Sequence, residues 1–392
     1  MQEGAFTRDR KLGFSNLVIY MMQKSSSASQ GELDDFFRKV SGDDFCVRTM
    51  TKGAFSQARA KLSHEVFREL DSITKNSFYK KSNPFAWDKF RLLAIDGSTI
   101  KLPQHTSIED EFGVHGFGPN ADSQQSMARI SLVYDPLNCI TLDAQIGAYI
   151  ESEAGLCKKH LTHIGKGDLV VFDRYYASFE LIETLRNKKA EFVFRMKDDW
   201  WKVVEEFQKE GLKDKVVSIA VTKHKKVSVR LVKHEYGEDK SMVLCTSLLD
   251  QQKYSVTDIA EVYEGRWGIE ESYKTLKNWC ELENFSGKTA LAVKQDFYAK
   301  IFMMNLGSVY AHPIDEKIRR EKPGNKVNRV QIIKSTKDMP LMLFIRKKTK
   351  KAFELFDDII SRTIEMIRPN RAFERKKRPK LKFNPLSNYK YA

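Results

Sequence analysis

Cysteine and histidine are sparse in this chain, and neither type forms a metal-binding pattern. The eight histidines include His160 and His163, which are three residues apart, but no cysteine or third histidine follows at zinc-ligand spacing. The five cysteines form no Cys-x-x-Cys pair and predict buried free thiols in a reducing compartment. They are Cys46, Cys139, Cys157, Cys245 and Cys280. These absences argue against a zinc site and against a disulfide-stabilised secreted domain.

Long apolar runs are also absent, because no stretch reaches the roughly 18 residues that a membrane-spanning helix needs. One segment, residues 12–22, follows Arg8, Arg10 and Lys11 and has the outline of a secretory signal. However, Ser15 and Asn16 interrupt it, and its apolar positions also fit an amphipathic helix. We therefore expect a cytoplasmic protein with no membrane partner.

Basic residues are in excess. The 392 residues include 67 Lys and Arg against 52 Asp and Glu, a formal net charge of +15. Such a balance is typical of proteins that bind polyanions, although many basic proteins have no such partner. Hydrophobic residues make up 41% of the chain and aromatic residues 11%, which is enough for a packed core. The composition favours a globular protein whose partner is nucleic acid.

Hydrophobic periodicity divides the chain into helical ends and a mixed centre. Residues 1–85 are predicted to be helical up to the break at Ser82-Asn83-Pro84, and the pattern leaves open whether they pack as a bundle or contact DNA. Helical patterns return from Thr257 and continue to about residue 367. The basic residues that follow are typical of a solvated tail or of one lying on phosphates: Arg371, Arg375, Lys376, Lys377, Arg378, Lys380 and Lys382.

The centre alternates strand-like and helix-like segments, which predicts a mixed α/β sheet. Strands are expected at 90–95, 130–134, 139–149, 169–172 and 192–196, and helices at 153–163 and 179–187. From 198 to 255 we expect strands only, at 217–221, 227–234 and 242–247, with a turn at Tyr236-Gly237-Glu238-Asp239. This last part is predicted to be a β-strand insertion.

Two of the predicted strands run directly into an aspartate. Leu92-Leu93-Ala94-Ile95 precedes Asp96, and Leu169-Val170-Val171-Phe172 precedes Asp173. Either residue alone fits a turn or helix-cap aspartate. An acid at the end of a buried strand also projects from a rigid element, as a functional carboxylate must. Both interpretations stay open for each aspartate taken by itself.

A third acid lies in a segment with a distinctive spacing. Tyr263, Arg266, Glu270 and Lys277 are separated by three, four and seven residues. At about 100° per residue they would point within about 60° of one another on one helix. Glu is a hard oxygen ligand, whereas Arg and Lys neutralise phosphate oxygens. The face is therefore predicted to hold nucleic acid beside a metal ion.

Three carboxylates on rigid elements would repel one another unless cations lie between them. Asp96, Asp173 and Glu270 are accordingly predicted to bind two Mg²⁺ ions, with Mn²⁺ as a substitute. Two such ions, about 3.5–4 Å apart, activate a water or hydroxyl and stabilise the leaving oxygen at phosphorus. The chemistry inferred from these residues is phosphodiester cleavage and transfer.

These motifs together resemble a known family. Ile-Asp-Gly-Ser around Asp96, Phe-Asp-Arg-x-Tyr around Asp173, and the Tyr263, Arg266, Glu270 and Lys277 spacing with Trp267 after the arginine are similar to the bacterial insertion-sequence transposases of the DDE type with the YREK signature, the insertion sequence 4-like family. The spacing is the specific signal, since an aspartate after a strand recurs in many folds. The resemblance covers nearly the whole chain.

The resemblance implies a fold and a division of the chain. It implies a ribonuclease H-like mixed-sheet core with a β-strand insertion, flanked by helical N- and C-terminal regions. The regions would be 1–85 for DNA binding, 86–197 and 256–312 for the core, 198–255 for the insertion, and 313–392 for the basic C-terminus. Trp200 and Trp201 begin the insertion, where the family manages a DNA hairpin, although each also fits core packing.

The resemblance also implies an activity and residue roles. Asp96, Asp173 and Glu270 would form the metal-binding catalytic triad, and Tyr263, Arg266 and Lys277 would hold phosphates of the transposon end. The enzyme would cut double-stranded DNA at the element's ends and join it to target DNA, acting as a homodimer on DNA in the bacterial cytoplasm, at the nucleoid. Two alternatives stay open: a catalytically silent, transposase-derived DNA-binding protein, and a structure-dependent nuclease that hydrolyses DNA without joining it.

Overall fold

The chain forms two compact units, each built from segments distant in sequence. In this computed structural model, the described residues are 11–23, 29–116, 124–197, 201–222, 225–236 and 240–367. The first unit contains Met1–Ser82, Thr99–Ala128 and Lys274–Ala392, and the second contains Asn83–Ser98 and Arg129–Tyr273. The division between the units falls within β1 and within β3.

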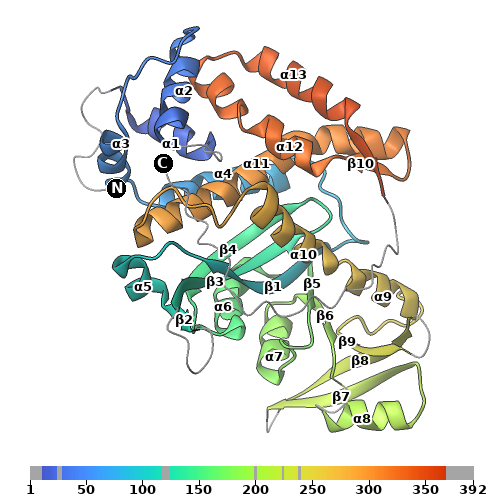
Figure 1. Cartoon of the computed structure of the whole chain (residues 1–392). Helices are drawn as coiled ribbons and strands as arrows, with labels where there is room; N and C mark the ends of the chain where they lie inside the picture. The colour runs from blue at the N-terminus through green and yellow to red at the C-terminus, as the bar shows by residue number, and fades with distance from the viewer. Residues whose placement is uncertain are drawn as a thin grey trace. The chain divides into compact units, whose positions relative to one another are not determined.

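The second unit carries most of the sheet (Figure 1). Its strands, with β1 and β3 shared between units, are β1 (Arg91–Lys101), β3 (Gln124–Asp135), β4 (Ile140–Ala148), β5 (Asp168–Phe172), β6 (Glu191–Arg195), β7 (Asp214–Thr222), β8 (Lys225–Glu235) and β9 (Ser241–Thr246). Its helices are α6 (Glu153–His160), η1 (Leu161–His163), α7 (Phe179–Asn187), α8 (Lys202–Lys209), α9 (Val256–Glu264) and α10 (Trp267–Lys274).

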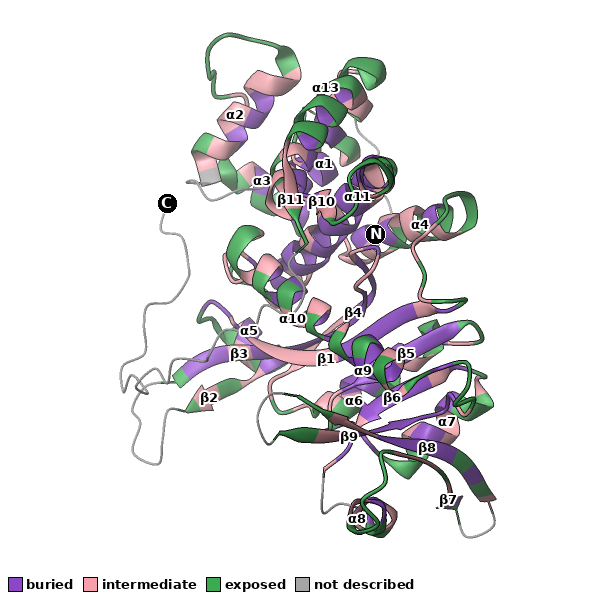
Figure 2. Cartoon of the chain, turned by 90° about the vertical axis from the view of Figure 1, so that its right-hand side faces the viewer, coloured by how far each residue is buried: buried purple, intermediate pink, exposed green. Residues whose placement is uncertain are grey.

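The sheet is mixed, as the sequence predicts. Its strand order is β2-β3-β1-β5-β6-β9-β8-β7, with β4 paired to β3. The central strands β1, β5 and β6 are parallel, whereas β6, β9, β8 and β7 pair antiparallel in succession. Parallel central strands are covered on both faces, which explains why β5 is buried along its whole length (Figure 2).

The segment predicted to contain strands only also contains a helix. Helix α8 precedes the hairpin of β7 and β8 and buries Val204 and Phe207. Trp201, at the start of α8, is buried and stacks on Phe179 with ring centroids 4.4 Å apart, so it packs in the core. Trp200 and the turn residues 237–239 lie outside the described residues. The strands of this segment continue the main sheet through the β6–β9 pairing.

The first unit is mostly helical. Its elements are α1 (Phe14–Gln23), α2 (Ser29–Ser41), α3 (Lys52–Arg59), α4 (Glu65–Lys81), α5 (Thr106–Phe112), β2 (Val114–Gly116), η2 (Thr275–Trp279), α11 (Ala290–Glu321), β10 (Asn325–Val327), α12 (Arg329–Thr336), η3 (Leu341–Ile345), α13 (Thr349–Arg362) and β11 (Ile364–Met366). The two-stranded pairing of β10 and β11 interrupts the helical region predicted to run to residue 367. The basic residues from Arg371 to Lys382 lie outside the described ranges.

The cysteines and the apolar segments were the subject of two further predictions. All five cysteines are free thiols, and the prediction that they are buried is confirmed for Cys157 and Cys245. It is wrong for Cys46, which is exposed, whereas Cys139 and Cys280 are partly buried. Cys46 follows α2 in an exposed loop. Among the helices that the structure describes, none is both long and apolar enough to cross a bilayer.

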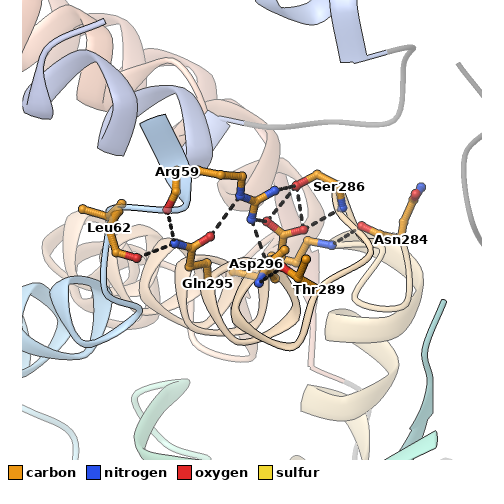
Figure 3. A network of polar contacts seen from close by, with 9 residues as sticks. Arg59, Leu62, Asn284, Ser286, Thr289, Gln295 and Asp296 are labelled. Atoms are coloured by element: carbon orange, nitrogen blue, oxygen red, sulfur yellow. Dashed lines mark hydrogen bonds and ion pairs between the residues drawn. The ribbon is translucent and has the colours of Figure 1, made fainter. Parts of the chain in front are cut away.

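A buried ion pair fixes α3 to α11 within the first unit (Figure 3). Arg59 and Asp296 are both buried, and Arg59 Nη2 lies 3.0 Å from Asp296 Oδ1. Arg59 Nη1 also donates to Ser286 Oγ, and Nε donates to Gln295 Oε1. Gln295 in turn donates to the carbonyl oxygens of Arg59 and Leu62. The guanidinium thus has a polar partner on each nitrogen, which makes its burial tolerable.

We expect Asp296→Ala to lower the free energy of unfolding of the first unit by about 3–5 kcal/mol, because it leaves the Arg59 guanidinium buried without its carboxylate. Glu354→Ala is the control, since Glu354 pairs with Lys350 on the exposed surface of α13 at 3.9 Å and its loss should cost less than about 1 kcal/mol. Urea unfolding followed by circular dichroism measures both. Equal losses in the two variants would contradict the structural role of the Arg59–Asp296 pair.

Candidate active site

Asp96 and Asp173 lie on neighbouring parallel strands. The register of β1 and β5 pairs Ile95 with Phe172, so the two aspartates follow in adjacent positions. Asp173 lies just past the end of β5, as predicted, whereas β1 continues beyond Asp96 to Lys101. The strand is fully buried from Leu92 to Ile95 and half-buried from Asp96 to Thr99, which explains why the apolar run ends before the strand does.

Glu270 lies on α10, and Arg266 links it to Asp96. Arg266 Nη2 is 3.0 Å from Glu270 Oε1, and Arg266 Nη1 is 3.8 Å from Asp96 Oδ2. The arginine is only 7% exposed. Its burial disfavours the charge, but the nearby Tyr263, Asp173 and Glu270 outweigh this effect and raise the pKa of Arg266. A guanidinium therefore stands between acids that come from three elements.

Asp96 is in an environment that disfavours its charge. Burial raises the pKa of Asp96 to about 6, and the neighbouring carboxylates Glu153 and Asp173 add to the increase. The Gly97 amide, which donates to Asp96 Oδ1, and the Arg266 guanidinium act in the opposite direction. The two carboxylates near Asp96 thus add negative charge that Arg266 offsets only in part.

Glu153 is an acid of this site that the sequence reasoning missed. It opens α6 after the Ser152 cap, and its Oε1 accepts from Arg129 Nη1 at 2.9 Å. Its side chain lies over Gly97: a Cβ at that glycine would be 2.6 Å from Glu153 Cγ. No local sequence signal marks Glu153, because its proximity to Asp96 depends on how α6 packs on β1.

The donor chemistry of the site fits a hard divalent cation. Asp96, Asp173, Glu153 and Glu270 offer carboxylate oxygens. The charges of Glu153 and Asp173, which add to the effect of burial on the pKa of Asp96, are charges that a cation would neutralise. As they stand, however, no three Asp, Glu, His or Cys side chains within the described ranges are close enough to hold a metal ion. A bound cation would therefore have to draw these side chains together.

The segment from Tyr263 to Lys277 is not the single α-helix that the spacing predicts. Helix α9 ends at Glu264, and main-chain bonds from Arg266, Gly268 and Ile269 reach back only three residues, to Tyr263, Gly265 and Arg266. Such bonds wind the chain more tightly than an α-helix does. Helix α10 then passes into the π-helical η2, which contains Lys277. The prediction that the four residues share one face of a single helix is therefore wrong.

Two glycines explain the interruption. A Cβ at Gly268 would be 2.6 Å from Pro136 Cβ, and one at Gly265 would be 3.0 Å from Leu92 Cδ2. The turn thus packs directly on β1 and on the residue that follows β3. As a result Tyr263 and Arg266 are buried, at 3% and 7% exposure, and they contribute to the interior of the second unit.

Lys277 belongs to the first unit. Its Nζ donates to the carbonyl oxygen of Thr99 at 2.8 Å, and burial lowers the pKa of its ammonium group. The structure therefore brings Asp96, Asp173, Tyr263, Arg266 and Glu270 into one unit, whereas Lys277 is held in the other.

Comparison with known proteins assigns the part of the chain that contains these residues to a family. The sequence model of the family described as "Transposase DDE domain" matches residues 87–306, more than half of the chain. The chain belongs to the DDE-domain transposases. This match includes the five site residues of the second unit as well as Lys277.

Two curated relatives of this DDE transposase come from Escherichia coli (strain K12). It is 23% identical to the putative transposase InsZ over 191 residues, which is 47% of this chain and 61% of that protein. It is 23% identical to the transposase InsG for insertion sequence element IS4 over 269 residues, which is 64% of this chain and 59% of that protein. The chain thus spans about three fifths of the length of each relative.

A solved structure supports the fold. The piggyBac transposase in a synaptic complex with hairpin DNA superposes with a TM-score of 0.50 at 14% identity, covering 93% of this chain and 77% of that one. At this identity the likeness concerns the fold alone. It confirms the predicted mixed α/β, ribonuclease H-like core with helical regions in this DDE transposase.

Arg266→Ala should lower the free energy of unfolding of the second unit by about 2–4 kcal/mol, because Asp96 and Glu270 lose the cation between them. Arg186→Ala is the matched control: Arg186 is exposed and pairs with Glu191 at 3.8 Å, so the cost should stay below about 1 kcal/mol. Chemical unfolding of both variants tests this. A loss for Arg266→Ala no larger than that of the control would rule out its role as counter-ion.

Proposed function

We propose that this chain is a DNA transposase that cuts DNA at the ends of an insertion sequence and joins the freed 3′-hydroxyl to target DNA. The family match supports the transposase class. The observation that carries the finer proposal is the arrangement of Asp96, Asp173 and Glu270 around one buried arginine. This arrangement provides acids from β1, from the end of β5 and from α10, three rigid elements of one unit.

Asp96, Asp173 and Glu270 would hold divalent metal, Mg²⁺ with Mn²⁺ as a substitute. When bound, two such ions supply activation of the attacking oxygen and stabilisation of the leaving oxygen in an in-line displacement at phosphorus. The chain's own contribution is to fix the acids on β1, β5 and α10 and to place cationic groups beside them. The raised pKa of Asp96 supports this role, because a bound cation would stabilise the charged form of its carboxylate.

Tyr263, Arg266 and Lys277 would contact phosphates of the transposon end. Arginine suits this role because its planar guanidinium matches phosphate oxygens. The net charge of +15 supports a polyanionic partner. We further propose that double-stranded DNA is bound by a homodimer in the bacterial cytoplasm. The regions would have the roles that the family resemblance implies: DNA binding for 1–85, the catalytic core for 86–197 and 256–312, the β-strand insertion for 198–255, and the basic C-terminal region for 313–392.

Metal-dependent cleavage of labelled DNA that carries the element's own end sequences tests the proposal on a denaturing gel. We expect nicks, hairpins and joined products with Mg²⁺ for the wild type, and at least a 100-fold loss for Asp96→Ala and Glu270→Gln with DNA binding retained. Glu271→Gln is the matched control, since this neighbouring acid is exposed. Wild-type cleavage by Glu270→Gln would refute the assignment.

The same gel separates the two other candidates. Binding without any cleavage would favour a catalytically silent DNA-binding protein. Metal-dependent cleavage without joined products would favour a nuclease.

DNA affinity should fall steeply with salt, since cationic side chains release counter-ions from phosphates on binding. The logarithm of the affinity should decrease with a slope of about −0.9 per phosphate contact, and Lys277→Ala should make that slope shallower by about 0.9. Fluorescence anisotropy between 50 and 200 mM salt, roughly the range in which such contacts are lost, measures it. A slope near zero for the wild type would exclude a DNA partner.

A further inference from the structure

The main chain at Asp96 is held by two hydroxyl groups from different elements of the second unit. The Tyr273 hydroxyl donates to the Asp96 carbonyl oxygen at 2.7 Å, and Ser131 Oγ donates to the same oxygen at 3.2 Å. Tyr273 is 6% exposed and Ser131 is fully buried. An ordinary strand carbonyl has one partner in the ladder, so two side-chain donors on one oxygen mark Asp96 as a specially anchored residue.

Ser131 is the end of a longer buried chain of polar groups. His160 Nε2 lies 2.9 Å from Ser131 Oγ, and His160 Nδ1 lies 2.6 Å from Asp143 Oδ2. Asp143 also accepts from Gln145 Nε2 at 2.8 Å. His160 is fully buried, and Asp143 is 6% exposed. The chain thus connects β4, α6 and β3 to the carbonyl of Asp96, with both ring nitrogens of His160 engaged.

The residue types Ser131, His160 and Asp143 are those of a hydrolytic triad, but the geometry argues against that role. Ser131 Oγ has no exposure to solvent, and its hydrogen is directed to the Asp96 carbonyl. A nucleophile must reach a substrate carbon. The chain is therefore structural in its direct action, and what it positions is the strand residue that bears the carboxylate.

Tyr273 connects that strand to the third acid. It follows Glu270 by three residues on α10, so both side chains lie on adjacent positions of one helix face. The bond from Tyr273 to Asp96 therefore fixes the helix that carries Glu270 to the strand that carries Asp96.

We propose that Tyr273 and the chain Ser131–His160–Asp143 are positioning residues that fix the separation of the Asp96 and Glu270 carboxylates for a divalent cation. This inference rests on the proposed function, which makes those acids metal ligands. Groups that orient a ligand typically change metal affinity by about 10–100-fold when they are removed. The hydroxyls of Tyr273 and Ser131 act here through the main chain of Asp96.

Mn²⁺ binding to the full chain, followed by electron paramagnetic resonance in the absence of DNA, tests the inference without relying on activity. Tyr273→Phe and Ser131→Ala should each raise the half-saturating Mn²⁺ concentration by about 10-fold. Tyr254→Phe is the matched control, because it removes a hydroxyl that donates to Asp88 at 2.8 Å in the same unit. The control should lose similar thermal stability but keep wild-type Mn²⁺ binding.

A second readout separates positioning from general weakening. In the DNA cleavage assay, Tyr273→Phe should raise the half-saturating Mg²⁺ concentration by about 10-fold while the affinity for DNA stays at the wild-type value. Unchanged Mn²⁺ and Mg²⁺ dependence in both variants, with Asp96→Ala abolishing Mn²⁺ binding, would overturn the inference and leave the proposed function standing. Wild-type Mn²⁺ binding by Asp96→Ala would overturn both.

Discussion

The parallel pairing of β1 with β5 is the constraint on which the rest of the site depends. Its register aligns Ile95 with Phe172, and each of these residues is followed in the chain by an aspartate. Parallel strands place these residues at one edge of the sheet, and their side chains cannot separate without breaking the ladder. The fold therefore forces two carboxylates together, and burial of Asp96 makes this arrangement costlier. The cationic group beside these acids offsets the cost of bringing them together.

Arg266 provides this cationic group, and the backbone around it makes its position possible. A regular α-helix through Gly265 and Gly268 would keep the chain turning at about 100° per residue. The tighter turn at Arg266, together with the absence of side chains at the two glycines, lets this stretch lie against Leu92 and Pro136. The guanidinium then reaches both Asp96 and Glu270. The interruption of the helix is thus what brings a cation to the acids.

The features that could be predicted from the sequence are those that depend on a local pattern of residues. The apolar runs before Asp96 and Asp173 gave two central strands correctly, because a buried parallel strand needs a continuous apolar run. Helix α7 begins and ends where its pattern predicts, since Ser178 caps it and Lys188 ends it. The mixed sheet followed from the alternation of strands and helices, and the fold likeness confirms it.

What the sequence could not predict depends on contacts between distant segments. The helix break at Gly265 follows from how closely this turn packs on β1, and a lone glycine in a helical pattern does not reveal that contact. Helix α8 was missed because it is short and lies between strand-like segments. Glu153 and the anchoring of Asp96 by Tyr273 and Ser131 come from α6, α10 and β3, whose proximity only the fold determines. Contacts of this kind cannot be recognised from the spacing of residues along the sequence.

Under the proposed function, Arg266 has two competing tasks, and this competition has a consequence. In the described structure its guanidinium neutralises Glu270 and lies near Asp96. A divalent cation at the acids would take over that neutralisation and leave the guanidinium to a phosphate. Metal would then strengthen DNA binding through Arg266, and by reciprocity DNA would strengthen metal binding by the same factor. A buried arginine among carboxylates is thus compatible with a role in DNA contact, because its present partners are the groups that a cation would satisfy.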